Sequence, residues 1–327
     1  MGFRELGRTF REIKRFKVVL VYLGAYLLFN DGLQTVVAIA GAFAADTLRI
    51  ALAFNMATVV IIQFVASPGA LAFGWLANKL STKPALMISL MGWIVIVLFG
   101  VAIAPLSPKA HTDFDFQIEY QAGANDYVVA AAPGSTHELQ LGDESWILSK
   151  GADLKPSAVV DLPESVRQSD DFAYSLSIQG GPSDGESAVG RLHPSVLGSG
   201  PVDWWPILVR SVIWEPLGLH AGLQWLLLGV LVGLVIGGSQ ALARSLFSQI
   251  TPESRSGEFF SFFGFMSRAS SVFGPTLYIF ATAVFDTRVA VTSILLIIVA
   301  GTIVLKWVDV AEGIKVAARE EARIQNV

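Results

Sequence analysis

Polar residues interrupt the first long apolar segment of the chain, between positions 29 and 35. The segment runs from Val18 to Ala45 and contains the run Phe29-Asn30-Asp31-Gly32-Leu33-Gln34-Thr35. An ionisable residue inside a membrane span costs roughly 2.5–3.5 kcal/mol on insertion scales and usually faces a bundle interior or a water-filled cavity. Asn30, Asp31, Gln34 and Thr35 could therefore bind a proton or the amine of a small solute. The alternative is a helix break whose polar groups bind freed backbone groups.

Three further polar residues in apolar segments join this substrate- or proton-binding hypothesis. Gln63 lies in the middle of the second segment, and Gln240 lies near the end of the fourth. Neutral polar residues in spans commonly form hydrogen bonds between helices, and this is the alternative to direct contact with a solute. Arg268 falls within the fifth segment. It either extends along its helix towards the interface or pairs in the interior, where Asp31 is the expected partner.

Charged residues in the connections between apolar segments are candidates for gating. Lys79 and Lys83 lie between the second and third segments. Their alternative role is to anchor the cytoplasmic side under the positive-inside rule. A second group in the fourth-to-fifth connection predicts salt bridges that open and close with the bundle, or else a solvated loop: Arg244, Glu253, Arg255 and Glu258.

The elements that would position these residues are six apolar segments. The chain is 53% hydrophobic and 15% charged, with a mean hydropathy of +0.57. About 20 residues of helix cross a hydrocarbon core of about 30 Å. The sequence therefore predicts an all-α polytopic membrane protein with six transmembrane helices: Val18–Ala45, Ile50–Ala77, Ala85–Ala104, Leu223–Phe247, Phe259–Phe285 and Val289–Val308.

The charges outside these segments predict the orientation. Residues 1–17 form a basic, amphipathic leader, expected as a helix on the inner membrane face or as a lead-in to the first span. Cations also occur in the second-to-third connection and in the tail at 309–327. The positive-inside rule then places both termini in the cytoplasm. The expected location is a bacterial cytoplasmic (inner) membrane, with the lipid bilayer as a partner.

A long insert at 106–222 separates transmembrane residues 18–105 from transmembrane residues 223–308. Residues 106–221 hold six Lys and Arg against sixteen Asp and Glu. Apolar residues alternate with polar ones in several short runs, which is typical of half-buried strands. The sequence predicts a small, β-rich, acidic, extracytoplasmic domain, with surface loops at Ser165–Asp171 and Gly180–Gly190 and strands at 114–120, Tyr127–Ala131, Glu138–Leu141, Trp146–Leu148 and Tyr174–Ile178.

Several kinds of chemistry are not expected. The chain has no cysteine, and its four histidines are widely spaced and fit no metal-ligand pattern. No Ser-His-Asp arrangement or phosphate-binding glycine loop is visible in the sequence. We therefore expect no metal, no cofactor and no enzymatic activity. The acidic insert lacks a basic patch, which argues against binding of nucleic acid.

Three segments together resemble one family. They are the run around Asn30-Asp31-Gly32, residues 237–245 (GGSQALARS) and residues 252–260 (PESRSGEFF). They look like the C-terminal half of the vacuole-effluxer-like transporters of the major facilitator superfamily, related to yeast vacuolar amino-acid exporters. The resemblance implies half of a twelve-span fold, with the solute held near the midplane between two halves.

This resemblance also implies partners. The six spans would correspond to spans seven to twelve, so a complete transporter would need a second six-helix half, either a separate chain or a second copy. A truncated, inactive chain is a further reading. Residues 74–85 resemble the loop motif of the superfamily, except that Asn78 replaces its usual aspartate and Ser81 its usual glycine.

Two functions follow from these observations. The first is gradient-driven transport of a small solute, such as an amino acid. The second is a non-transporting membrane anchor that displays the acidic domain for binding or assembly.

Overall fold

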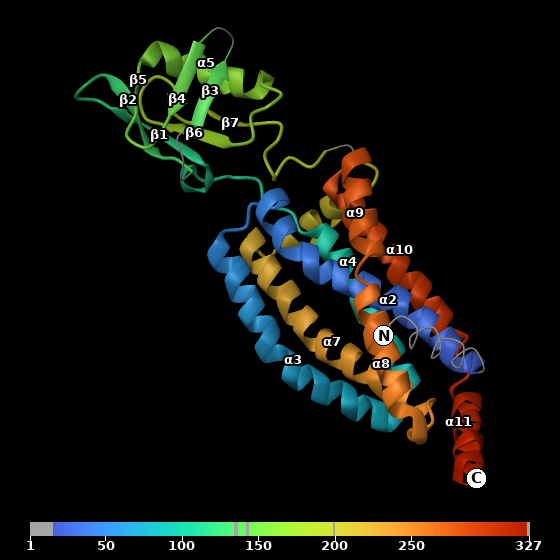
Figure 1. Ribbon diagram of the computed structural model, residues 1–327. Helices are drawn as coiled ribbons and strands as arrows, with labels where there is room; N and C mark the ends of the chain where they lie inside the picture. The colour runs from blue at the N-terminus through green and yellow to red at the C-terminus, as the bar shows by residue number, and fades with distance from the viewer. Residues whose placement is uncertain (1–15, 134–136, 142–143, 199, 326–327) are drawn as a thin grey trace. The chain divides into compact units, whose positions relative to one another are not determined.

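The computed structural model describes residues 16–133, 137–141, 144–198 and 200–325 (Figure 1). The expected leader helix at 1–17 lies almost entirely outside these residues. The chain divides into two compact units. One, here called the insert unit, spans Ala104–Ser199, and the other, here called the helical unit, contains the remaining residues on both sides of it. Each unit is described by itself.

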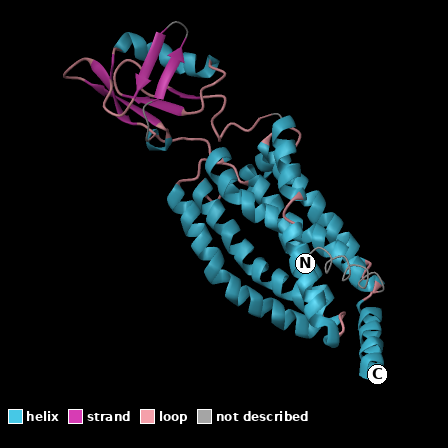
Figure 2. Ribbon diagram, in the orientation of Figure 1, coloured by secondary structure: helices cyan, strands magenta, loops and turns pink. Residues whose placement is uncertain are grey.

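The helical unit consists of helices joined by short connections (Figure 2). Five stretches are long and apolar enough to cross a membrane: Lys17–Thr47, Leu52–Leu80, Thr82–Ala102, Ala221–Gln249 and Thr287–Lys306. The helices are α2 (Lys17–Ala42), η1 (Phe43–Thr47), α3 (Leu52–Leu80), α4 (Thr82–Ala102), α6 (Trp204–Val209), η3 (Arg210–Trp214), α7 (Ala221–Gln249), η4 (Glu253–Arg255), α8 (Ser256–Ala269), α9 (Phe273–Val284), α10 (Thr287–Lys306) and α11 (Val310–Gln325).

The predicted continuous fifth span, Phe259–Phe285, is wrong in one respect. The structure divides it into α8 and α9, with a break at 270–272. Pro275 provides the physical reason, because it has no N–H to donate to the carbonyl of Ser271 and its ring clashes with that carbonyl in a continuous helix. Pro275 instead occupies the first turn of α9, where no donor is needed. Both pieces are shorter than the five long helices.

The glycines of α7 bring it close to α3. A methyl group added to Gly229, Gly233 or Gly237 would overlap atoms of Thr58, Val65 or Ala66 on α3. Small residues of this kind let helix backbones approach closely. On the other side of the unit α2 packs along α10, and α4 contacts both α7 and α10.

The insert unit is built on a five-stranded sheet with the order β5-β2-β1-β6-β7. The central pair, β1 and β6, is parallel, and the other pairs are antiparallel. Helix α5 (Pro156–Gln168) places Val159, Leu162 and Val166 in the same core as the sheet residues. A separate hairpin joins β3 and β4. The strands are β1 (Phe116–Gln121), β2 (Asp126–Ala131), β3 (His137–Leu141), β4 (Glu144–Leu148), β5 (Asp153–Leu154), β6 (Ser175–Gln179) and β7 (Ser187–Val189).

The five predicted strands of the insert are confirmed within a few residues, but the two predicted loops are wrong in part. Residues 165–168 belong to α5, and residues 187–189 form β7. The apolar spacing of Val159, Leu162 and Val166 is helical and accounts for α5. Residues 200–222, which were expected with the insert, cluster with the helical unit and form α6 and η3.

Candidate functional site

The structure brings Asn30 of α2 together with the α8–α9 break and α7. The Asn30 side chain is fully buried. Its Nδ2 donates to Ser270 Oγ at 2.5 Å, and its Oδ1 accepts from Gln240 Nε2 at 3.3 Å. These bonds join α2 to two elements that lie more than 200 residues away from it in sequence. We call Asn30, Asp31, Thr35, Gln240 and Ser270 the polar cluster.

Asp31 lies beside Asn30 and is 1% exposed. Neither of its carboxylate oxygens has a hydrogen-bond partner among the described residues. The backbone N–H groups of Val272, Phe273 and Gly274, at the start of α9, lie close to the carboxylate but do not reach hydrogen-bond geometry. A helix N-terminus carries partial positive charge, which attracts a nearby carboxylate. The result is a buried carboxylate that can still accept a proton or a donor group.

The close approach of α9 to α2 depends on Gly274. A methyl group at this position would overlap Thr35 Oγ1 and would lie 3.0 Å from Asp31 Oδ2. Thr35 Oγ1 donates to the Asp31 carbonyl at 2.7 Å, so its hydroxyl is bound within α2. Gln34 is half-buried one position earlier. Breaks in spanning helices are tolerated where they line a cavity or where other groups satisfy the backbone.

A cavity of about 380 Å³ begins at Val36, the residue that follows Thr35 of the polar cluster. Its walls come from α2, α3, α4, α7 and α10, and they include Gln63, which is exposed. Val36 on α2 and Ile236 on α7 mark its boundary towards Asn30 and Gln240. Gln63 therefore lies on a cavity but makes no contact with the polar cluster that the structure records.

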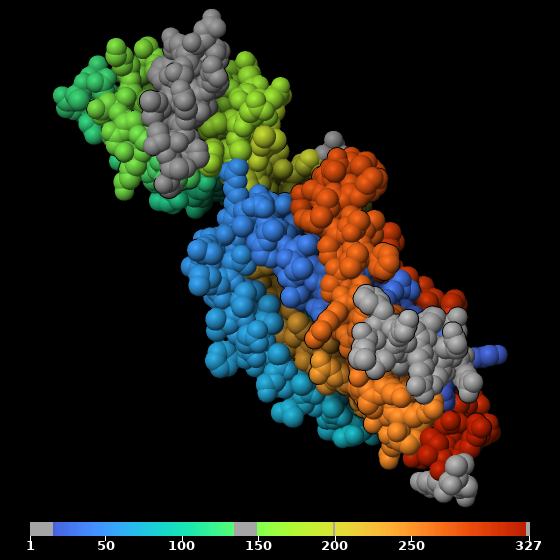
Figure 3. All heavy atoms as spheres, in the orientation of Figure 1, coloured from blue at the N-terminus to red at the C-terminus, as the bar shows by residue number. Residues whose placement is uncertain are grey.

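Arg268 does not form the expected interior pair with Asp31. It lies in the last turn of α8, and its side chain is exposed. In Figure 3 the atoms of α8 and α9 form part of the outer surface of the helical unit. Because the neighbouring Ser267 carbonyl lies 3.4 Å from Asn30 Nδ2, Arg268 lies level with the middle of α2. The physical reason for the missing pair is that α9 packs against Asp31 through Gly274 and fills the space beside the carboxylate.

Lys83 has a structural role that the sequence did not predict. Its Nζ donates to the carbonyls of Lys306 and Val308, at 2.9 and 2.7 Å, and thus caps the C-terminus of α10. Arg288, near the start of α10, donates in return to the carbonyls of Val101 and Ile103 at the end of α4. The two helices therefore cap each other, each through its second residue.

The other gating candidates are on the surface. Lys79 Nζ lies 3.9 Å from the centre of the Trp75 ring, a cation–π contact. Among the described residues, no ion pair joins Arg244 to Glu253 or Glu258. Arg255 lies in η4, and the neighbouring Ser254 binds Glu321 of α11 through both its N–H and its hydroxyl. These two hydrogen bonds link the fourth-to-fifth connection to α11.

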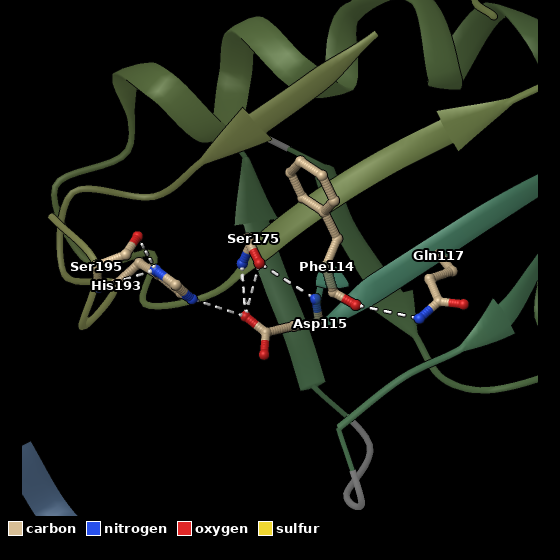
Figure 4. Close-up of polar contacts among 6 residues, drawn as sticks. All are labelled: Phe114, Asp115, Gln117, Ser175, His193 and Ser195. Atoms are coloured by element: carbon tan, nitrogen blue, oxygen red, sulfur yellow. Dashed lines mark hydrogen bonds and ion pairs between the residues drawn. The ribbon is translucent and has the colours of Figure 1, made fainter. Parts of the chain in front are cut away.

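The insert unit contains a second polar group, around Asp115 (Figure 4). Asp115 Oδ2 accepts from the Ser175 backbone N–H at 2.8 Å and from the Ser175 hydroxyl at 3.0 Å. His193 Nε2 lies 3.3 Å from the same oxygen. The Ser195 N–H donates to His193 Nδ1, so this nitrogen is the acceptor and Nε2 carries the proton towards Asp115. These contacts join the starts of β1 and β6 to the 190–198 segment.

This arrangement has the residue types of a Ser-His-Asp triad, which the sequence analysis did not find. Ser195 Oγ lies 2.7 Å from His193 Nδ1, but Ser195 is only 4% exposed. A catalytic serine must reach a substrate carbonyl. Burial raises the pKa of Asp115, but hydrogen bonds from His193 and Ser175 outweigh it and hold the pKa below its usual value. The geometry fits a half-buried structural tie between the starts of β1 and β6 and the 190–198 segment.

Comparison with known proteins gives one family. A family model described as "Vacuole effluxer Atg22 like" matches residues 1–118 and 201–318. The chain is 31% identical to Autophagy-related protein 22 of Kluyveromyces lactis over 106 residues, which are 32% of this chain and 22% of that protein. It is 23% identical to an uncharacterized MFS-type transporter, YxiO, of Bacillus subtilis (strain 168) over 99 residues, 30% of this chain and 23% of that protein.

Autophagy-related protein 22 of Saccharomyces cerevisiae (strain S288c) is 35% identical over 69 residues, 21% of this chain and 13% of that protein. The chain thus spans less than a quarter of the length of each of these three relatives. No solved structure matches the chain significantly. Both stretches matched by the family model lie mainly in the helical unit and leave residues 119–200 unmatched.

Proposed function

Because this chain belongs to the vacuole effluxer Atg22-like family, we propose that it carries a small solute across a membrane as one half of a gradient-driven transporter. Its five long apolar helices make it an integral membrane protein. The names of its relatives, which include an MFS-type transporter, support transport as the activity. Amino acids are the first solutes to test, because the three segments described above resemble those of yeast vacuolar amino-acid exporters.

The observation that carries this proposal is the unpartnered carboxylate of Asp31. A buried ionisable group in a span is costly and is commonly retained where protons or substrates pass. In many secondary transporters, discontinuous helices place their ends at the substrate and ion sites. Here the start of α9 approaches Asp31, while Asn30 ties the break to α7. We propose that Asp31 is the group whose proton occupancy changes during transport, and that Asn30, Gln34, Thr35, Gln63, Gln240 and Arg268 contribute to solute binding.

The second half of the transporter is part of the proposal. Together α8 and α9 cover 256–284, a length that can complete a sixth span. A six-span half needs a second half to enclose a solute at the midplane. Either a separate chain or a second copy can supply it. Size measurement of the purified chain in detergent distinguishes a homodimer from a monomer that awaits another chain.

We also propose that both termini lie in the cytoplasm and that the insert unit lies outside. The chain has no cysteine, so a single cysteine reports its own location. A membrane-impermeant maleimide applied to intact cells should label Asp171→Cys in the insert unit and leave Lys315→Cys unlabelled. The reverse pattern would overturn the orientation.

The transport test compares Asp31→Asn with a matched control, Asp46→Asn. Asp46 is an exposed carboxylate at the end of the same candidate span. Cells of the source organism that lack the gene are complemented with each form, and efflux of preloaded amino acids is followed with and without a pH gradient. We expect Asp31→Asn to abolish gradient-dependent efflux and Asp46→Asn to preserve it. Unchanged, pH-dependent efflux by Asp31→Asn would refute the role of Asp31.

A second candidate function, a non-transporting anchor for the insert unit, rests on one observation. The insert unit has its own core, formed by the five-stranded sheet and α5. An anchor needs no buried carboxylate. If deletion of the gene changes no solute flux, while removal of residues 104–199 alone reproduces the phenotype of the deletion, the anchor function is favoured.

A further inference from the structure

The short helical segment 204–214, formed by α6 and η3, turns large apolar side chains outwards. Its exposed positions, with the residue that follows it, are 204, 207, 208, 211, 212 and 215. Steps of three and four residues place these positions on one side of a helix. Two of them, Trp204 and Val212, are 65% and 64% exposed. The large apolar residues on this side are Trp204, Ile207, Leu208 and Val212.

The charged and polar residues of the segment are buried or paired. Asp203, which precedes α6, is 7% exposed. Arg210 is half-buried, and its Nε lies 3.6 Å from Glu215 Oε1. Ser211 lies on the exposed side, but its hydroxyl donates to the Leu208 carbonyl at 2.9 Å. A helix in water shows the opposite pattern, with its apolar face inwards and its charged face outwards. The exposed side of 204–214 is therefore suited to apolar surroundings.

Two indole hydrogen bonds hold the segment against the end of α4. Trp205 Nε1 donates to the Leu98 carbonyl at 2.8 Å, and Trp214 Nε1 donates to the Ala102 carbonyl at 3.0 Å. Both carbonyls belong to the last residues of α4, which is a candidate membrane span. The segment thus lies level with the end of that span. Tryptophan is enriched at this level, where the hydrocarbon core of a membrane meets the headgroups.

The exposed face of α4 leads to this segment. Large apolar residues recur along α4 at steps of three and four, and all of them are exposed: Ile88, Met91, Val95 and Leu98. An aliphatic stripe on a membrane span is suited to contact with acyl chains. Leu98 is the last residue of this stripe, and its carbonyl accepts the Trp205 hydrogen bond. The stripe on α4 therefore reaches the segment.

We propose that segment 204–214 contacts lipid at the membrane interface, with its exposed side among the headgroups and the upper acyl chains beside the end of α4. The six residues of α6 and the five of η3 extend over about 16 Å, too short to cross a hydrocarbon core of about 30 Å. An amphipathic helix of this kind lies in the interface. The bilayer is the occupant that fits, because the apolar stripe of a span ends at this segment. The proposal does not require that the chain be a transporter.

Spin labels test this contact in the full chain, which has no cysteine of its own. Leu208→Cys and Val212→Cys each receive a nitroxide label in phosphatidylcholine nanodiscs. Collision of the label with oxygen, which concentrates in lipid, is compared with collision with a water-soluble nickel chelate. Val160→Cys is the matched control, because Val160 is a helical valine of the insert unit, outside the candidate spans, and is 56% exposed. Met91→Cys supplies the value for the exposed face of a span.

The ratio of oxygen to nickel collision should be severalfold higher for Leu208→Cys and Val212→Cys than for Val160→Cys, and should approach the ratio for Met91→Cys. Two labelled positions on one side keep the test decisive if one variant fails to fold. Low collision with both reagents would mean that protein covers this side of the segment. A ratio equal to that of Val160→Cys would mean that the side faces water. Either result would overturn the proposal.

Discussion

The tie around Asp115 in the insert unit offers a sharp test of the electrostatic argument. Asp115 Oδ2 accepts from the Ser175 N–H and from His193 Nε2, at 2.8 and 3.3 Å. Hydrogen bonds to a charged group contribute about 1.5–3 kcal/mol, against about 0.5–1.5 kcal/mol for neutral pairs. Asp115→Asn keeps the shape but removes the charge from these two bonds and from the third, which the Ser175 hydroxyl donates at 3.0 Å. We therefore expect a total loss of about 2 kcal/mol.

Hydrogen exchange measured on the full chain can detect this loss locally. A change of about 2 kcal/mol raises the population of the open state about 30-fold, and amides at 175–179 should exchange faster by this factor. The control is Asp170→Asn. Asp170 forms an ion pair with Arg191, but its side chain is 81% exposed, so the pair is screened and its loss should have little effect. Wild-type exchange at 175–179 in Asp115→Asn would refute the reasoning.

The same variant predicts a pH dependence. The pKa of Asp115 is lowered in the folded protein. Its contribution to stability is therefore fully present above the unfolded pKa of about 3.9 and is lost as the pH falls through the lower folded value. The difference between wild type and Asp115→Asn should disappear as the pH falls through the folded pKa of Asp115. A difference that persists after complete protonation of Asp115 would mean that shape, rather than charge, stabilises the tie.

Three further predictions concern the helical unit, and thermal unfolding in detergent checks each of them. Lys83→Met should lower the melting temperature by about 4 °C, because the C-terminal carbonyls of α10 lose their cationic donor, whereas Lys79→Met should change it little. Gly237→Leu should destabilise the unit severely, because its side chain would overlap α3, while Gly264→Ala, which has open space around it, should be tolerated. Asn30→Ala should cost about 1–3 kcal/mol, because the buried Ser270 hydroxyl and the half-buried Gln240 amide lose a partner.

The long apolar helices were predictable because hydropathy is a local property. All five long candidate spans overlap predicted segments, and the alternation in the insert predicted its strands. The α8–α9 break was missed although it has a local signal. Pro275 with Gly274 and the serines before it is a combination that interrupts a helix. A prediction from hydrophobicity alone misses this break, because the residues around it are compatible with a membrane span.

The candidate site was predictable only in part. The unusual composition around Asn30 and Asp31 pointed to this part of α2, since polar residues are costly in a span. Their partners could not be read from the sequence, because Ser270 and Gln240 are 240 and 210 residues away from Asn30. The same limit applies to Lys83. A cation at the end of a span looks like an anchor, and only the fold shows that it lies on the last carbonyls of α10.

The mutual capping of α4 and α10 has a consequence for the order in which the chain is assembled. The carbonyls of Val101 and Ile103 are synthesised well before Arg288, which follows them by more than 180 residues. Until α10 is in place, the C-terminal carbonyls of α4 lack the donor that Arg288 provides. Afterwards, removal of either helix would leave the C-terminal carbonyls of the other helix without their cationic donor. The last long helix, α10, therefore completes the capping of both helices. A nascent chain released before residue 288 would contain α2 and α7, which carry part of the polar cluster, but would lack the contacts of Arg288 with the end of α4.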